Sequence, residues 1–473
     1  MTSQNNDIYQ EIANAVSDET ELFRPDTQQY EEAIRHWGKS SSEYALFSVE
    51  PGTAEDLAAI LCILAAKRVQ WAVKSGGHAT NRGFSSTSGV QIFMNRFKQI
   101  TLNKDANKDV KTVTVGTGLT WDEIYDELTP QNLNVVGGRV PGVGVGGLLL
   151  GGGYSWLTSQ YGLAIDNVKQ FEVVLPNGQI KTVTEADNDL WFGLRGGLNN
   201  FGIVTVVTLA TYPQGQIWGG IKYVDGQDFD ALTAAVTNFA QNNQDRRASI
   251  LPVYSILRAP WETRQGAMLA NLMLFYDGAE LPAGVFQEFM DLKEVPVLPT
   301  DLKTRTFANF VSSIPANNWL QGDRVAFHSL LVPEIRREHV QEIQNIITVR
   351  IAALGGRWPF QFTALEVQPF DASLYTYGAD SAFPPKRDSP LYPIGIYWSW
   401  KDSAEDQYAW DTVRRVADRL RNILPGDESV YVNYALADTP LEAMYGDNVE
   451  RLHDIRVQYD SSNLMSLTGG FRF

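Results

Sequence analysis

Cysteine is almost absent from the sequence, which has one, Cys62, among 473 residues. A disulfide within the chain is therefore impossible. The sequence also lacks an Asn-X-Ser/Thr acceptor for N-glycosylation, and residues 1–7 lack the basic and apolar segments of a secretory signal. These absences favour a cytoplasmic, reducing location, although a secreted chain trimmed of its signal would begin in the same way.

Positive charge is also scarce, because 55 Asp and Glu residues outnumber 39 Lys and Arg residues and give a formal net charge of −16. Nucleic-acid binding draws much of its affinity from clustered Lys and Arg, so this balance argues against nucleic acid as a partner. No apolar run has the length that a bilayer crossing needs, and the five histidines show no metal-ligand spacing. We therefore expect no membrane partner and no metal site.

The first 212 residues have the pattern of a mixed α and β segment. Apolar residues recur at helical spacing over 55–68, and a short strand-like stretch over 70–74 leads into a glycine loop. Further strands, several rich in Val and Thr, are expected over 90–94, 111–116, 171–175, 179–183 and 202–211. We predict a first domain over 1–212.

A second pattern begins at residue 213, where glycine becomes less frequent. An expected strand over 268–276 is accompanied by amphipathic helices over 334–354 and 404–424. We therefore predict a second domain over 213–425. The remaining residues, 426–473, return to short motifs rich in Tyr, Asn and Gly and are expected to fold back against the first domain.

The first motif that carries chemistry is the loop Ser75-Gly76-Gly77-His78, which follows the expected strand over 70–74. Its two glycines allow a sharp turn whose N–H groups can face an anion such as a pyrophosphate. A histidine in such a loop lies beside a bound cofactor. For a histidine taken alone, a hydrogen-bonded structural role is the commoner interpretation.

A second glycine-rich segment spans 137–153. Each glycine in a helix interior costs roughly 1 kcal/mol relative to alanine, so this density predicts that the segment forms no normal core helix. Close approach of the backbone to a ligand explains the glycines better, and a flexible loop is the alternative. A third segment, 190–205, again places glycines before a Val-rich strand.

These three segments, in this order, resemble the FAD-linked oxidases with the vanillyl-alcohol-oxidase fold. The match is closest to the berberine-bridge-enzyme-like branch, particularly its fungal members and the 6-hydroxynicotine oxidases. The end of the chain fits too, since the motifs at 431–434, 445–448, 450–452 and 459–460 are similar to the closing motifs of that branch. The resemblance implies an α+β fold: a two-part PCMH-type FAD-binding domain and a substrate domain with an antiparallel sheet backed by helices.

The resemblance also implies FAD as the cofactor, bonded from a ring nitrogen of His78 to the 8α-methyl of the flavin. Many family members add a second bond from a cysteine at the position that Val140 occupies here, so we expect one covalent link. Val143 matches a position beside the flavin where smaller residues tend to accompany oxidases. The other residues expected to line the cofactor are Ser75, Gly76, Gly77, Gly144, Gly147, Gly151, Gly152, Gly153, Ile203, Val204 and Asn433.

Oxidation of an alcohol or amine needs a base that takes a proton while a hydride leaves the substrate. By motif position the resemblance favours Tyr434, with Tyr431 and Tyr154 as further candidates and Glu366, in the strand-like stretch 360–367, as the carboxylate alternative. An unperturbed tyrosine titrates near pH 10, so this role requires a neighbouring cation or hydrogen bond. Ordinary packed tyrosines and a solvent-facing Glu366 are the alternatives.

The sequence therefore predicts an FAD-dependent oxidase that takes a hydride from a small organic substrate and passes electrons to O2. A dehydrogenase or an oxidative cyclase would use the same hydride transfer, and a flavin-binding protein without turnover is a rival of another class. The substrate stays open. The aromatic residues Tyr375, Tyr377, Tyr397 and Trp398 suggest a flat or apolar molecule or a sugar, and they could equally belong to the core.

Overall fold

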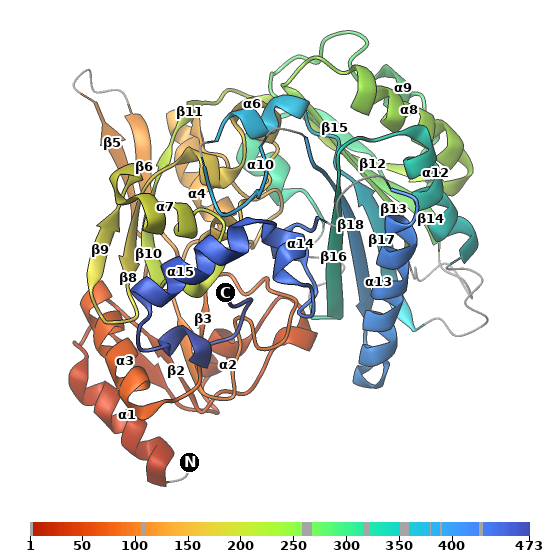
Figure 1. The fold of residues 1–473 in the computed structure, drawn as a ribbon. Helices are drawn as coiled ribbons and strands as arrows, with labels where there is room; N and C mark the ends of the chain where they lie inside the picture. Colours follow the sequence, from red (N-terminus) through yellow and green to blue (C-terminus); the bar gives the residue numbers. More distant parts are fainter. Residues whose placement is uncertain are drawn as a thin grey trace.

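The computed structural model describes residues 3–105, 110–257, 267–315, 322–350, 359–378, 380–387, 390–424 and 429–473. The side chain of Tyr375 and residues 351–354, the end of one expected helix, lie outside the described part. Helices and strands occur together throughout the described residues, so the predicted α+β class is confirmed (Figure 1).

The first sheet has the order β1-β2-β4-β3, formed by Glu21–Phe23, Phe47–Glu50, Val90–Phe93 and Trp71–Lys74. Helices α1 (Ser3–Ala15) and α3 (Ala54–Lys67) pack together beside it. Helix α3 begins where the Thr53 side chain accepts a hydrogen bond from the Asp56 N–H, and it ends at Arg68 in the left-handed conformation. The sheet positions the loop that follows β3, which carries His78.

The second sheet has the order β5-β6-β10-β8-β9, and all its pairs are antiparallel. Its strands are Ile100–Lys104, Val110–Gly116, Ile203–Ala210, Val168–Val174 and Ile180–Val183. Between β6 and β10 the chain forms α4 (Trp121–Leu128), β7 (Leu133–Asn134), α5 (Val145–Leu150), α6 (Thr158–Tyr161) and α7 (Asn188–Leu194). Strand β11 (Tyr212–Pro213) then pairs with β7. The second and third glycine-rich segments thus lie on the connections of this sheet.

The glycine-rich segment 137–153 forms no long core helix, but one short helix, α5, lies within it. Helix α5 has only six residues and contains Gly146 and Gly147. Its other four residues are Val145 and three leucines, of which Val145, Leu149 and Leu150 are buried. Burial of this apolar side offsets the low helix propensity of glycine over so short a length.

The third sheet is fully antiparallel and has seven strands in the order β15-β12-β14-β13-β17-β18-β16. The strands are Asp301–Arg305, Ile217–Asp225, Ala267–Tyr276, Ala248–Leu257, Phe360–Val367, Tyr392–Trp400 and Arg324–Val332. Helices α8 (Phe229–Asn242), α12 (Arg337–Asn345) and α13 (Asp406–Arg421) cover its outer face (Figure 1). An antiparallel sheet backed by helices was predicted, and it is confirmed.

Shorter helices complete this part of the chain: α9 (Gln287–Met290) and α10 (Phe307–Ser312). The helix expected over 334–354 is α12, which ends at Asn345 and continues as a π-helical segment over 346–350. None of the helices in the described ranges combines the length and apolar character that a bilayer crossing needs.

The end of the chain, with α14 (Leu441–Tyr445) and α15 (Asn448–Tyr459), contacts the first sheet and the loop that follows it. Thr468 forms a parallel bridge with Trp71, and the Asn81 side chain donates a 2.8 Å hydrogen bond to the Ala435 carbonyl. The domain boundaries at 212 and 425 stay a prediction.

Candidate functional site

A large cavity lies where the glycine segments, the end of the chain and the inner face of the seven-stranded sheet meet. These elements come from distant parts of the sequence, and buried residues of the second and third glycine segments, the end of the chain and the sheet belong to one hydrophobic cluster. The predicted site residues in the cavity wall are Ser75, Gly76, Gly77, His78, Val140, Val143, Gly144, Gly147, Tyr154, Ile203, Val204, Glu366, Tyr431, Asn433 and Tyr434.

In this wall the backbones of the first two glycine segments pack directly against each other at Gly76 and Gly144. A Cβ on Gly76 would come within 2.3 Å of the Gly144 nitrogen, and a Cβ on Gly144 within 2.2 Å of the Gly76 nitrogen. Ser75 supports this contact, because its hydroxyl donates to the Thr117 carbonyl at 2.5 Å. Only glycine at both positions permits the two backbones to pack so closely.

Three predicted cofactor residues, Gly151, Gly152 and Gly153, are not among the residues that line the cavity. A Cβ on Gly151 would come within 2.1 Å of the Asn433 side-chain oxygen, and the Gly153 N–H donates a 3.2 Å hydrogen bond to the Tyr431 hydroxyl. These glycines therefore let the end of the chain pack against helix α5.

His78 follows β3, and its ring stacks on Trp37 with 5.3 Å between centroids and 16° between planes. Burial, with the nearby His36 adding to it, lowers the pKa of His78 to about 4. The imidazole is therefore neutral at pH 7, so one of its ring nitrogens keeps an unprotonated lone pair. A neutral ring on a cavity wall can act as a nucleophile towards a ligand.

Arg139, which the sequence patterns did not indicate, lies in the second glycine segment and also lines the cavity. Its Nη2 donates a 3.3 Å hydrogen bond to the Tyr434 hydroxyl. Tyr434 thus has the neighbouring cation that the role of a base requires. Its ring also makes edge contacts with Tyr431 and Tyr397, at centroid distances of 5.0 and 5.7 Å.

Glu366 lies on β17 and is only 4% exposed, which excludes the solvent-facing alternative. Its carboxylate accepts hydrogen bonds from the Tyr397 hydroxyl and the Gln368 side chain. Burial raises the pKa of Glu366, and the positive charge of Arg139 opposes that rise. Arg139, itself 8% exposed, therefore lies between an anion and a phenol.

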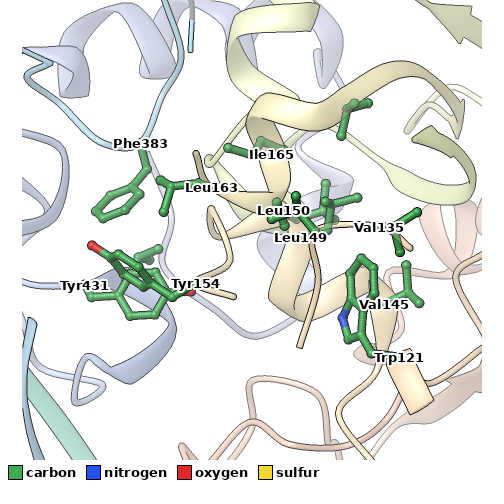
Figure 2. Close-up of a cluster of buried hydrophobic side chains, with 14 of the residues drawn as sticks. Trp121, Val135, Val145, Leu149, Leu150, Tyr154, Leu163, Ile165, Phe383 and Tyr431 are labelled. Atoms are coloured by element: carbon green, nitrogen blue, oxygen red, sulfur yellow. The ribbon is translucent and has the colours of Figure 1, made fainter. Parts of the chain in front are cut away.

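The other two tyrosine candidates are buried in an aromatic group beside the cavity (Figure 2). Tyr431 accepts a 2.8 Å hydrogen bond from Asn433, and burial raises its pKa well above the ordinary value. Tyr154 stacks on Phe370 with centroids 5.1 Å apart and meets Tyr431 edge-on at 4.8 Å. Within the described residues, Tyr431 has no arginine contact like that of Tyr434.

The aromatic residues suggested for the substrate pocket separate in the structure. Tyr397 lines the cavity. Trp398, the next residue on β18, points to the opposite face and belongs to the core beneath the outer helices. Tyr377 is 37% exposed and bonds to Arg246 outside the cavity.

The cavity residues fit a long, flat ligand such as FAD. Gly147 faces open space, since a Cβ there would meet no atom within 4 Å. The two touching glycine segments leave backbone rather than side chains along the wall, which suits close approach to a pyrophosphate. The seven-stranded sheet adds mainly apolar side chains to the rest of the wall.

Two family models match the chain: the FAD binding domain over residues 45–184 and the model described as berberine and berberine like over 430–468. An uncharacterized FAD-linked oxidoreductase of Arthroderma benhamiae is 33% identical over 396 residues, 80% of this chain and 74% of that protein. The FAD-dependent monooxygenase drtC of Aspergillus calidoustus is 29% identical over 446 residues, 90% of this chain and 82% of that protein.

Solved structures show the same fold. Glucooligosaccharide oxidase from Acremonium strictum, described with a 6-S-cysteinyl, 8α-N1-histidyl FAD, superposes with a TM-score of 0.77 at 20% identity and 97% coverage of both chains. The 6-hydroxy-D-nicotine oxidase of Arthrobacter nicotinovorans gives 0.77 at 17% identity, over 96% of this chain and 97% of that one. At these identities the likeness concerns the fold alone.

Proposed function

Because the chain belongs to the family of berberine-like FAD-linked oxidoreductases, we propose that it oxidises a small organic substrate with FAD bonded covalently to His78 and O2 as electron acceptor. The observation that carries this proposal is that His78 and the Arg139–Tyr434 pair line the same cavity. The neutral His78 ring supports attachment, and Val140 at the position of the second bond supports a single link.

In this mechanism the chain holds the substrate and moves its proton. Bound FAD supplies the hydride acceptor and the route of electrons to O2. In its phenolate form Tyr434 accepts the proton of the substrate hydroxyl or amine at its phenolic oxygen and becomes the neutral phenol, and Arg139 stabilises the negative charge of the phenolate before the transfer. Glu366, which bonds to Tyr397, interacts electrostatically with Arg139, while the buried aromatic rings exclude water.

The test is to digest the purified protein and locate the flavin by mass spectrometry. We expect flavin mass on the peptide that contains His78 and on no other peptide. The variant His78→Ala should release its flavin on acid precipitation, whereas the control His453→Ala, on α15, should keep it bonded. Colourless wild-type protein, or flavin on a peptide without His78, would contradict the proposal.

Reoxidation distinguishes an oxidase from a dehydrogenase. We expect the reduced protein to be reoxidised rapidly by air, because Val143 is a small residue on the cavity wall. In the variant Val143→Ile the added methylene should slow the reaction with O2 and leave anaerobic reduction unchanged. Sluggish reoxidation of the wild-type protein would instead favour a dehydrogenase or an oxidative cyclase.

The name of the Aspergillus relative favours a second candidate, a monooxygenase that inserts oxygen into the substrate. The two reactions differ in the fate of O2, which becomes H2O2 in an oxidase and partly product in a monooxygenase. Turnover under 18O2 separates them. Label in the product supports the monooxygenase, and unlabelled product with one H2O2 per turnover supports the oxidase.

A further inference from the structure

We propose that Asn271 is a specificity-determining residue in an otherwise apolar substrate subsite, and that the substrate is a mainly apolar, fused-ring molecule with one remote hydrogen-bonding group. The inference rests on the proposed function, because it concerns the same cavity. The proposed substrate is thus a polycyclic aromatic compound rather than an oligosaccharide.

Asn271 lies on β14 with its side chain in the cavity wall, and it is 9% exposed. Its side-chain oxygen has no hydrogen-bond partner among the described residues. A buried amide oxygen without a partner is costly, so such groups are usually satisfied by a ligand or by water. A ligand in the cavity that donates a hydrogen bond would satisfy the Asn271 side chain.

The side chains around Asn271 are apolar. Alternate residues of neighbouring strands face the cavity, as a sheet requires. The cavity residues supplied by β12, β13, β14, β16 and β17 besides Asn271 and Glu366 are Ile221, Leu251, Val253, Met273, Phe327 and Phe362. An oligosaccharide carries hydroxyls along its length and would leave many of them unsatisfied on such a surface.

The other two polar side chains that the sheet contributes to the cavity, Glu366 and Tyr397, each have a hydrogen-bond partner. Glu366 and Tyr397 bond to each other, and Arg139 bonds to Tyr434. On the sheet side of the cavity, within the described residues, Asn271 therefore differs from Glu366 and Tyr397 in having its oxygen unpaired. One remote hydrogen-bonding group on the substrate would match it.

The sheet register fixes how far this group lies from the reacting end. Val253 on β13 pairs with Asn271 on one side and with Glu366 on the other. Asn271 and Glu366 thus flank one residue in the same row, two strand spacings or about 10 Å apart. A fused two-ring molecule with a substituent at each end spans a distance of this order.

The experiment measures binding to the holoenzyme from changes in flavin absorbance, without turnover. The probes are 6-hydroxy-2-naphthylmethanol, 2-naphthylmethanol and cellobiose. We expect both naphthyl probes to bind, the hydroxylated one about five- to tenfold more tightly, as one net hydrogen bond predicts. Cellobiose should bind more weakly than either.

Asn271→Leu, which keeps a similar volume, should remove the preference between the two naphthyl probes. The matched control Met273→Leu, two residues along the same strand face, should retain it. Asn271→Ala gives a second variant if the leucine is not accommodated. An unchanged preference in both Asn271 variants, failure of both naphthyl probes to bind, or tighter binding of cellobiose would overturn the inference.

Failure of this inference and failure of the proposed function are separable. Yellow protein with flavin on His78 but no Asn271-dependent preference contradicts the subsite alone. Protein without flavin contradicts the proposed function, and the same probes are then titrated by quenching of tryptophan fluorescence, with the same expected preference.

Discussion

Arg139 and Tyr434 are 295 positions apart in the sequence, yet the guanidinium donates a 3.3 Å hydrogen bond to the phenol. Arg139 comes from the second glycine segment and Tyr434 from the end of the chain, so the pair joins two walls of the cavity. The positive guanidinium thus faces the oxygen that would take the substrate proton. The contact is the physical reason for placing the base at Tyr434.

Replacing Tyr434 by phenylalanine removes the proton acceptor and leaves the ring in place. We expect anaerobic flavin reduction, by any substrate that reduces the wild type, to slow by about 10²- to 10⁴-fold in stopped-flow measurements. Flavin attachment should persist. Tyr445→Phe is the control, because the Tyr445 hydroxyl donates to the Gly196 carbonyl away from the cavity. Near-normal reduction in Tyr434→Phe would remove this residue from the role.

Glu366→Gln separates the two candidates for the base. Glutamine keeps the volume and can still accept the Tyr397 hydrogen bond, but it removes the negative charge near Arg139. If Glu366 only positions Arg139, the rate of flavin reduction should fall by about tenfold or less, the effect of a modest electrostatic change. A loss as large as that in Tyr434→Phe would make Glu366 the base.

The contact between Gly76 and Gly144 predicts a strong effect of one methyl group. Gly76→Ala should force the two segments apart, lower the free energy of unfolding by about 1–3 kcal/mol or more and reduce flavin content. Gly147→Ala is the control for stability, because its Cβ meets no atom and alanine favours a helix by about 1 kcal/mol. Equal stability of the two variants, measured by chemical denaturation, would contradict the packing described for this wall.

His328 predicts a dependence of stability on pH. Burial, with Arg421 next, lowers its pKa from 6.5 to about 4. Between these two pKa values the unfolded chain binds a proton at His328 that the folded protein does not. The contribution of His328 to the free energy of unfolding is therefore complete above pH 6.5 and is lost as the pH falls towards 4. Between pH 7 and pH 4, His328 is expected to lower the free energy of unfolding by about 3 kcal/mol.

Chemical denaturation at pH 7 and pH 4 checks this value. His328→Gln should lose about 3 kcal/mol less than the wild type between the two pH values, whatever its stability at pH 7. His453→Gln, at an exposed position on α15, controls for the general effect of acid. The same loss in His328→Gln and the wild type would show that His328 does not carry this dependence.

Local patterns predicted much of the first part of the fold. The apolar spacing over 55–68 corresponds to α3 at Ala54–Lys67, and the strand expected over 90–94 is β4 at Val90–Phe93. Both elements have their signals within a few neighbouring residues: helical periodicity and a capping threonine in one, an apolar run in the other. The resemblance to a family supplied the arrangement of these elements and the cofactor.

Long-range relationships were beyond the local patterns. Strands β13 and β16 are buried along nearly their whole length and lack alternation, so their apolar runs do not reveal strand order. Arg139 lies among glycines, whose pattern indicates a role for the backbone rather than for a side chain. Its partner, Tyr434, is far along the chain. The unsatisfied Asn271 has no signal in the sequence, since its meaning depends on what surrounds it in the cavity.

The contact of Thr468 with Trp71 has a consequence for how the protein matures. Part of the cavity wall comes from 431–434 and 470–471, which the ribosome makes well after the glycine segments. The earlier glycine segments can emerge and begin to fold, but no closed binding site exists until these residues have left the exit tunnel. Capture of the cofactor in its final position therefore has to follow the synthesis of residue 471.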